Sequence, residues 1–230
     1  MTDGALTAAD PTVRARAAAI VGHSGRWPRG MAEALSALVH SDPAPAVREA
    51  ALRALVRRAH PSRALASWRV ATQDLDAGMR RAAATVAPGL AARAGAPGVA
   101  APLITLLDDR DALVAEASAF ALGEVVSRAL DAPTAHAVVD ALARHAADHS
   151  DALVREACVA ALGSLRGADV EGTAAALGVL LAAARDKPAI RRRAVIALSA
   201  FDDPAAERAI QDALTDRDWQ VRQLAEDLLA

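Results

Sequence analysis

One short segment is repeated along the chain, in seven copies. It is clearest as Val-Arg-Glu-Ala-Ala-Leu-Arg-Ala-Leu at Val47–Leu55. The matching segments begin at Val13, Val47, Met79, Val114, Val154, Ile190 and Val221, so consecutive copies start 31 to 40 residues apart. A period of this length is typical of stacked two-helix units and not of an enzyme built around one central site.

The composition favours helices and predicts a cytoplasmic protein. It is 53% hydrophobic but only 2% aromatic, so Ala and Leu supply most of the apolar surface, which favours helix over strand. The single cysteine, Cys158, excludes an internal disulfide and fits a reducing compartment. The longest uncharged stretch, Ala94–Leu107, is too short to span a bilayer, and Met1–Asp10 has no basic residue, unlike a signal peptide. We therefore expect a cytoplasmic protein with no membrane segment.

Charge is distributed unevenly along the chain, although the net charge is only −2. Residues 11–100 contain 13 Arg against five acids, a balance of +8. Residues 101–230 contain 13 Arg or Lys against 21 acids, a balance of −8. In a stack of repeats this difference predicts a basic half and an acidic half, and hence a partner of opposite polarity or head-to-tail self-association.

Each repeated segment predicts one amphipathic helix that follows an Asp-rich turn. In the fifth copy the apolar residues recur at steps of three and four, which makes one stripe: Val154, Cys158, Ala161, Leu162 and Leu165. A second set of helices lies between the copies, and most of them have Pro near their start. These outer helices are expected at Met31–Val39, Pro61–Ala71, Pro102–Leu107, Thr134–Ala146, Ala174–Ala184 and Pro204–Leu214.

The pattern Asp-x-x-x-x-Val-Arg-x-x-Ala-Ala-x-Ala-Leu-Gly resembles HEAT repeats, particularly the short kind named after bilin lyases. It covers nearly the whole chain after residue 10 and is carried, for example, by Val47-Arg48 and Val154-Arg155. The resemblance implies an all-α, right-handed α-solenoid of about seven HEAT-like helix pairs, forming a single repeat domain over 1–230. In the fourth copy Ala115 replaces the Arg, and Pro88-Gly89 breaks the end of the third copy, so we expect a hinge at 87–98.

The Arg that follows Val in six copies invites two interpretations. A row of guanidinium groups could bind anions, whereas in HEAT-like repeats this Arg usually pairs with a turn Asp of the neighbouring unit. Because residues shared by all repeats serve the repeat, we expect the second, structural role for Arg14, Arg48, Arg80, Arg155, Arg191 and Arg222.

Positions three, seven and eleven of each inner helix share one face, because they are four residues apart. The resemblance implies that this face lines the concave surface of the stack. The partner-binding residues predicted on it are Glu49, Arg53, Arg57, Arg81, Glu116, Phe120 and Glu124. An exposed aromatic residue between two Glu fits an anchor for a partner, although Phe120 could instead tuck between helices.

Two other clusters have a plain structural explanation beside the functional one. A basic run with His60 and Trp68 could grip phosphates and stack on bases, but a solvated helix face with one buried Trp explains the same residues. It comprises Arg53, Arg57, Arg58, Arg63 and Arg69. The sequence pI of about 6.3 argues against a dedicated nucleic-acid binder. His145 and His149 have the i, i+4 spacing of metal ligands, yet no well-placed third ligand accompanies them, so we predict no metal.

The sequence favours a non-enzymatic interaction scaffold, an adaptor that binds a partner protein or peptide on its concave inner-helix face. No phosphate loop, nucleophile elbow or His-Glu pair is present, so we predict no catalytic residue and no cofactor. The absent His-Glu pairs separate the chain from HEAT-like deoxyhypusine hydroxylases. The alternative is a HEAT-like enzyme or ligand carrier, similar to bilin lyases or DNA glycosylases, which would use the groove as an active cleft. Nucleic-acid binding by the basic half, 11–100, is the least favoured interpretation.

Overall fold

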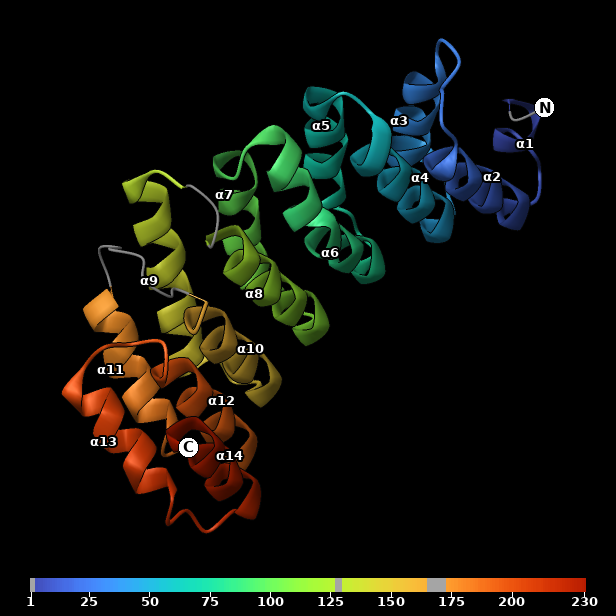
Figure 1. Ribbon diagram of the computed structural model, residues 1–230. Coiled ribbons are helices and arrows are strands. Elements are labelled where there is room, and N and C mark those ends of the chain that lie inside the picture. The colour runs from blue at the N-terminus through green and yellow to red at the C-terminus, as the bar shows by residue number, and fades with distance from the viewer. Residues whose placement is uncertain (1–2, 127–129, 165–172) are drawn as a thin grey trace. The chain divides into compact units, whose positions relative to one another are not determined.

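The computed structural model describes residues 3–126, 130–164 and 173–230, and within them it contains helices and connecting turns only (Figure 1). The first seven helices are α1 (Asp3–Leu6), α2 (Pro11–His23), α3 (Met31–Ser41), α4 (Pro45–Arg58), α5 (Pro61–Ala71), α6 (Ala77–Ala94) and α7 (Pro97–Leu106). The others are α8 (Ala112–Val126), α9 (Ala132–Asp148), α10 (Ala152–Leu162), α11 (Thr173–Ala183), α12 (Pro188–Leu198), α13 (Pro204–Ala213) and α14 (Trp219–Leu229). They form two compact units, Met1–Leu106 and Leu107–Ala230.

Both units have the same two-layer construction. In the first unit the inner helices α2, α4 and α6 pack in that order, and α3, α5 and α7 form the outer layer. In the second unit α8, α10, α12 and α14 form the inner layer and α9, α11 and α13 the outer layer (Figure 1). The prediction of an all-α solenoid built from helix pairs is therefore confirmed.

The predicted helix positions are right except around residues 87–102. Helix α6 continues through Pro88 to Ala94, so the expected break at Pro88-Gly89 is wrong. Leu90 and Ala91 after the proline are buried, and their packing outweighs the hydrogen bond that Pro88 cannot donate. The helix ends at Gly95, whose φ of 94° suits glycine, and α7 begins at Pro97 and not at Pro102. The hinge expected at 87–98 lies within the first unit and stays a prediction, and Leu165 lies outside the described residues.

Arginines of one repeat bind the turn of the next repeat. Arg48 donates through Nε and Nη2 to both carboxylate oxygens of Asp74, at 2.8 and 2.7 Å, and through Nη1 to the carbonyl oxygen of Asp42 at 2.9 Å. We call this pairing of an Arg with the turn Asp of the next repeat a rung. Further rungs join Arg14 to Asp42, Arg155 to Asp186 and Arg191 to Asp216. The structural role is confirmed for these four residues, because their guanidinium groups are used by the stack. Arg80 and Arg222 donate to carbonyl oxygens of the turn that precedes their own helix.

The rung is replaced where α8 meets α10. Ala115 stands at the Arg position and is fully buried, and His149 takes the place of the turn Asp. Its Nδ1 accepts from the backbone N–H of Asp151 at 3.1 Å, as Asp42 Oδ1 accepts from Ala44 at 2.9 Å. His145 lies buried nearby, with Nε2 2.9 Å from Asp108 Oδ1 and Nδ1 2.7 Å from the carbonyl oxygen of Ala141. Both histidines therefore hold the fold, and the described residues contain no group of three metal ligands.

Glycine lets neighbouring inner helices approach closely. A Cβ on Gly22 or Gly123 would lie 3.0 Å from the Ala that faces it on the next inner helix, which is closer than nine in ten real Cβ contacts. On Gly163 it would lie 2.9 Å away, a distance that real Cβ atoms hardly ever show. The facing residues are Ala54, Ala161 and Ala197. This pairing of Gly with Ala explains why the repeat pattern ends in Gly, since a larger side chain would force the helices apart.

Burial of the single cysteine predicts a chemically inert thiol. Cys158 is 0% exposed on α10, and desolvation by burial raises the pKa of its thiol to about 12. Because only the thiolate is nucleophilic, native protein at pH 8 is expected to react with Ellman's reagent about a thousandfold more slowly than unfolded protein, whose thiol has a pKa of about 8.5. One thiol per chain should titrate after denaturation in urea. Rapid labelling of the native protein would contradict the buried position.

Candidate functional site

Helix α4 carries three of the four predicted binding residues of the first unit along one stripe. Glu49, Arg53 and Arg57 follow each other at four-residue intervals, and two hollows open beside them. One hollow, of about 310 Å³ between α2 and α4, is lined by all three residues. The other, of about 410 Å³ between α4 and α6, is lined by Arg53 and Arg57. The structure thus brings these three residues together on an open surface.

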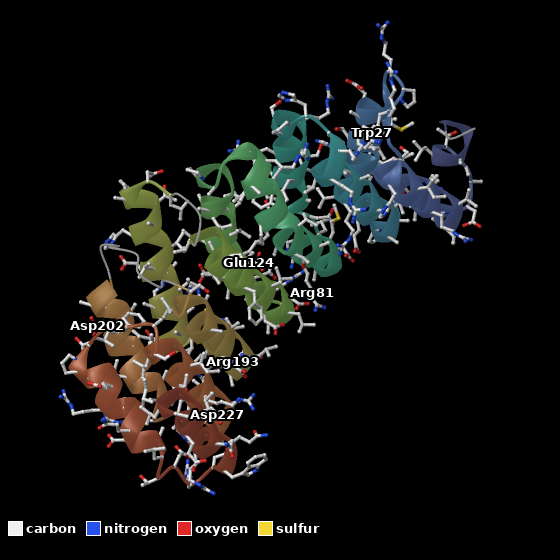
Figure 2. The ribbon with its side chains drawn as sticks, in the orientation of Figure 1. Trp27, Arg81, Glu124, Arg193, Asp202 and Asp227 are labelled. Carbon is white, nitrogen blue, oxygen red and sulfur yellow. The ribbon has the colours of Figure 1, made fainter. Side chains whose placement is uncertain are left out.

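The surface between α2, α4 and α6 is basic. Arg53 binds Glu49 Oε1 through Nε at 2.9 Å and Nη2 at 2.8 Å, and the two side chains are 48% and 39% exposed. Arg57 Nη1 lies 2.8 Å from the ring nitrogens of His23, and since a guanidinium only donates, the imidazole accepts. Arg81 is exposed on α6 (Figure 2) but does not line either hollow.

The sequence analysis missed Arg93. This residue lines the hollow between α4 and α6, and its guanidinium donates to the carbonyl oxygens of Val56 and Ala59 at the end of α4. The stripe of Arg81, Thr85 and Gly89 reaches Arg93 one turn later. The signal was available in this spacing, but the break expected at Pro88 hid it.

The corresponding surface of the second unit is acidic and partly apolar. Glu116, Phe120 and Glu124 lie on α8 at four-residue intervals, and Figure 2 labels Glu124. Phe120 is 47% exposed, so it does not tuck between helices. Position seven on the next two inner helices is Ala160 and Ile196, and Ile196 is 37% exposed. We call Phe120, Ala160 and Ile196 the apolar row.

One acid beside the apolar row also serves the stack. Glu156, at position three of α10, accepts from Nε of Arg193 on α12 at 3.1 Å. Figure 2 labels Arg193 on its helix. Glu116 occupies the same position three on α8 and is only partly exposed. The apolar row therefore lies beside carboxylates on two neighbouring helices.

The basic run does not form one surface in the first unit. Trp68 is 0% exposed and donates from Nε1 to the carbonyl oxygen of Ala83 at 2.8 Å. Arg63 pairs with Glu33 at 2.8 Å, and together with His60 it lines a separate hollow on α5. Trp68 therefore cannot stack on a base, as nucleic-acid binding would require. It joins α5 to α6 instead.

A further hollow of about 470 Å³ lies in the second unit among α11, α12, α13 and α14. Its carboxylate Asp216 is held by Arg191 in the ladder of rungs, and its other charged residues include Arg208 and Asp212. In the described part of the chain no helix is long and apolar enough to cross a membrane.

Comparison with known proteins agrees with this architecture. Residues 139–230 match the family model of HEAT repeats. The structure is similar to that of YibA from Escherichia coli, with a TM-score of 0.70 and 16% identity over 99% of this chain and 79% of that chain. It is also similar to a designed armadillo repeat protein in complex with the peptide (KR)4, with a TM-score of 0.63 and 16% identity over 86% of this chain and 98% of that chain. A second designed armadillo repeat protein gives a TM-score of 0.57 and 16% identity over 99% of this chain and 97% of that chain.

No curated protein matches the chain in sequence. The fold and the repeated rungs define the class of protein as an α-solenoid of the armadillo and HEAT type. Within that class, residues 139–230 are similar to HEAT repeats.

Proposed function

We propose that the protein is a non-enzymatic scaffold that binds a partner protein or an extended peptide on its inner-helix surfaces. The observation that carries this proposal is the exposed Phe120 beside the carboxylates of α8. The residues that hold the repeats together form the rungs and the Gly–Ala contacts, whereas the residues of the apolar row take part in neither. An exposed aromatic side chain on a repeat surface fits the anchor of an interface.

The charge around the apolar row indicates which side chains a partner would place there. Glu116 and Glu124 flank Phe120 on α8 by repeat position, whereas Glu156 is already paired with Arg193. Lys or Arg side chains of a peptide would therefore meet the carboxylates of α8 while an apolar residue covers the ring. The peptide bound to the designed armadillo protein is itself basic by its name, (KR)4. That likeness extends to the fold alone, and the acidic residues of this chain are the independent support.

Selection from a peptide library tests the proposal. Random 12-residue peptides displayed on phage are selected on the immobilised full chain, and the dissociation constants of the winners are measured. We expect basic peptides with one large apolar residue. Phe120→Ala should weaken them at least tenfold, as removal of an interface anchor typically does, and Glu116→Gln with Glu124→Gln should weaken them further.

The matched control is Leu214→Ala, which removes a residue of similar exposure, 38%, at the end of the outer helix α13. It should change the dissociation constants less than twofold. Peptides that bind Phe120→Ala and the unsubstituted chain equally well would place the binding surface elsewhere.

A further inference from the structure

We infer that the basic surface between α2, α4 and α6 is a second binding surface, which accepts an extended acidic peptide segment of a partner protein. This inference rests on the proposed scaffold function and adds the chemistry of one partner. The surface is defined by the two hollows that share Arg53 and Arg57. It lies wholly within the first unit.

The cations of this surface outnumber its acids. Arg53, Arg57 and Arg93 line the hollows, and Glu49 is the one acid among the lining residues. The first unit as a whole, residues 1–106, has 13 Arg against seven acids, a balance of +6. A surface with this field attracts carboxylates and repels basic peptides.

The Glu49–Arg53 contact shows how a carboxylate is held there. The guanidinium donates two N–H groups to one carboxylate oxygen, at 2.9 and 2.8 Å. This contact does not use the second oxygen, so it falls short of the two-oxygen fork with which Arg binds a carboxylate most strongly. Both side chains are well exposed, and an exposed i, i+4 pair of this kind contributes little to stability. A peptide carboxylate can therefore displace Glu49 at low cost.

The spacing of the arginines fits an extended chain. Arg53 and Arg57 are one helical turn apart, about 6 Å along the axis of α4. Alternate side chains of an extended peptide lie on one side about 6.6–6.8 Å apart, so Glu or Asp at every second position would meet both arginines. The floor of the hollows consists of small residues that let a peptide approach, including Ala19, Ala46 and Ala50.

A protein partner suits this surface better than a nucleic acid. Single-stranded nucleic acids bind where aromatic side chains stack on bases, and none of the residues lining the two hollows is Phe, Tyr or Trp. Trp68, the nearest candidate in sequence, is buried. The remaining feature, a modest positive balance broken by Glu49, matches carboxylates spaced along a peptide.

Fluorescence anisotropy with the full chain and a labelled (Glu-Ala)5 peptide tests the inference. We expect saturable binding of (Glu-Ala)5 that weakens as the salt concentration rises. Any binding of (Lys-Ala)5 should not change when Arg53 and Arg57 are substituted. Arg53→Glu with Arg57→Glu should weaken (Glu-Ala)5 at least tenfold. Glu49→Gln should tighten it about twofold to threefold, because the internal competitor is removed.

The matched control replaces two exposed arginines outside the hollows, Arg26→Glu with Arg69→Glu. It has the same net charge as the Arg53→Glu, Arg57→Glu variant. It should change the affinity less than threefold, and circular dichroism should confirm that both double variants are folded. The inference is overturned if (Glu-Ala)5 does not bind at low salt, or if both double variants lose it equally. It is also overturned if a 20-base-pair duplex competes with the peptide and depends on Arg53 and Arg57, which would make the surface a nucleic-acid site.

The two proposals fail separately. Phe120→Ala should leave (Glu-Ala)5 binding unchanged, whereas it should weaken the library peptides selected for the acidic surface. Loss of the acidic-peptide result alone would leave the scaffold function intact.

Discussion

Asp216→Ala is expected to lower the free energy of unfolding by about 3 kcal/mol. The substitution leaves the guanidinium of Arg191 without its carboxylate, and Arg191 is only 4% exposed. It also removes the acceptor of the backbone N–H of Asp218, which lies 2.7 Å from Asp216 Oδ1. Urea denaturation followed by circular dichroism at pH 7 measures the change.

Asp212→Ala is the control for this prediction, because Asp212 is exposed four residues earlier. It should alter stability by no more than about 0.5 kcal/mol. The hydrogen bond from Arg191 lowers the pKa of Asp216, so its contribution is complete above the unfolded pKa of about 4. That contribution is lost as the pH falls through the lower native pKa. Equal stability of Asp216→Ala and the unsubstituted chain would show that the rung does not hold the helices together.

Gly163→Ala is expected to destabilise the protein by about 1–3 kcal/mol. The new Cβ would lie 2.9 Å from the Cβ and 3.0 Å from the Cα of Ala197 on α12. A backbone atom cannot rotate away, so α10 and α12 must separate and lose contact along their length. Thermal and urea denaturation both report this loss.

Gly178→Ala is the matched substitution with the opposite sign. Gly178 lies inside α11, is exposed, and would place its Cβ in open space. Alanine there should stabilise the protein by about 0.5–1 kcal/mol, because glycine loses more backbone entropy on folding. Ala197→Gly combined with Gly163→Ala should recover part of the lost stability. A neutral Gly163→Ala would mean that the helices are not in tight contact at this point.

The fold could be predicted from sequence because every repeat states the same rule. Apolar residues at fixed spacing mark the buried side of each inner helix. In five of the seven, an Asp three residues before the first of them accepts from the first N–H groups, as Asp76 does from Met79 at 2.9 Å, whereas α4 and α12 begin at Pro without such a cap. Seven versions of one pattern correct each other's irregularities. Where only one copy has an irregularity, as at Pro88, sequence could not weigh the lost hydrogen bond against burial of Leu90.

The candidate surfaces were less accessible to prediction. Spacing alone placed Phe120 on the inner-helix face, but its depth depends on neighbours such as Ala160, which is too small to cover the ring. The hollows beside Arg53 and Arg57 likewise depend on how closely α2, α4 and α6 approach. These distances depend on packing between repeats and cannot be predicted from the sequence of a single repeat.

The rungs also bear on how such a chain can change length. Each rung takes its Arg from one repeat and its Asp from the next, so removing residues 42–73 would bring Asp74 to the place of Asp42 opposite Arg14. Recombination in register between repeats therefore creates no unpaired buried charge. The junction of Ala115 and His149 is the exception: joining the turn of His149 to a repeat that carries Arg48 would set a guanidinium against an imidazole. Duplication and loss of repeats should be tolerated on either side of that junction and selected against across it.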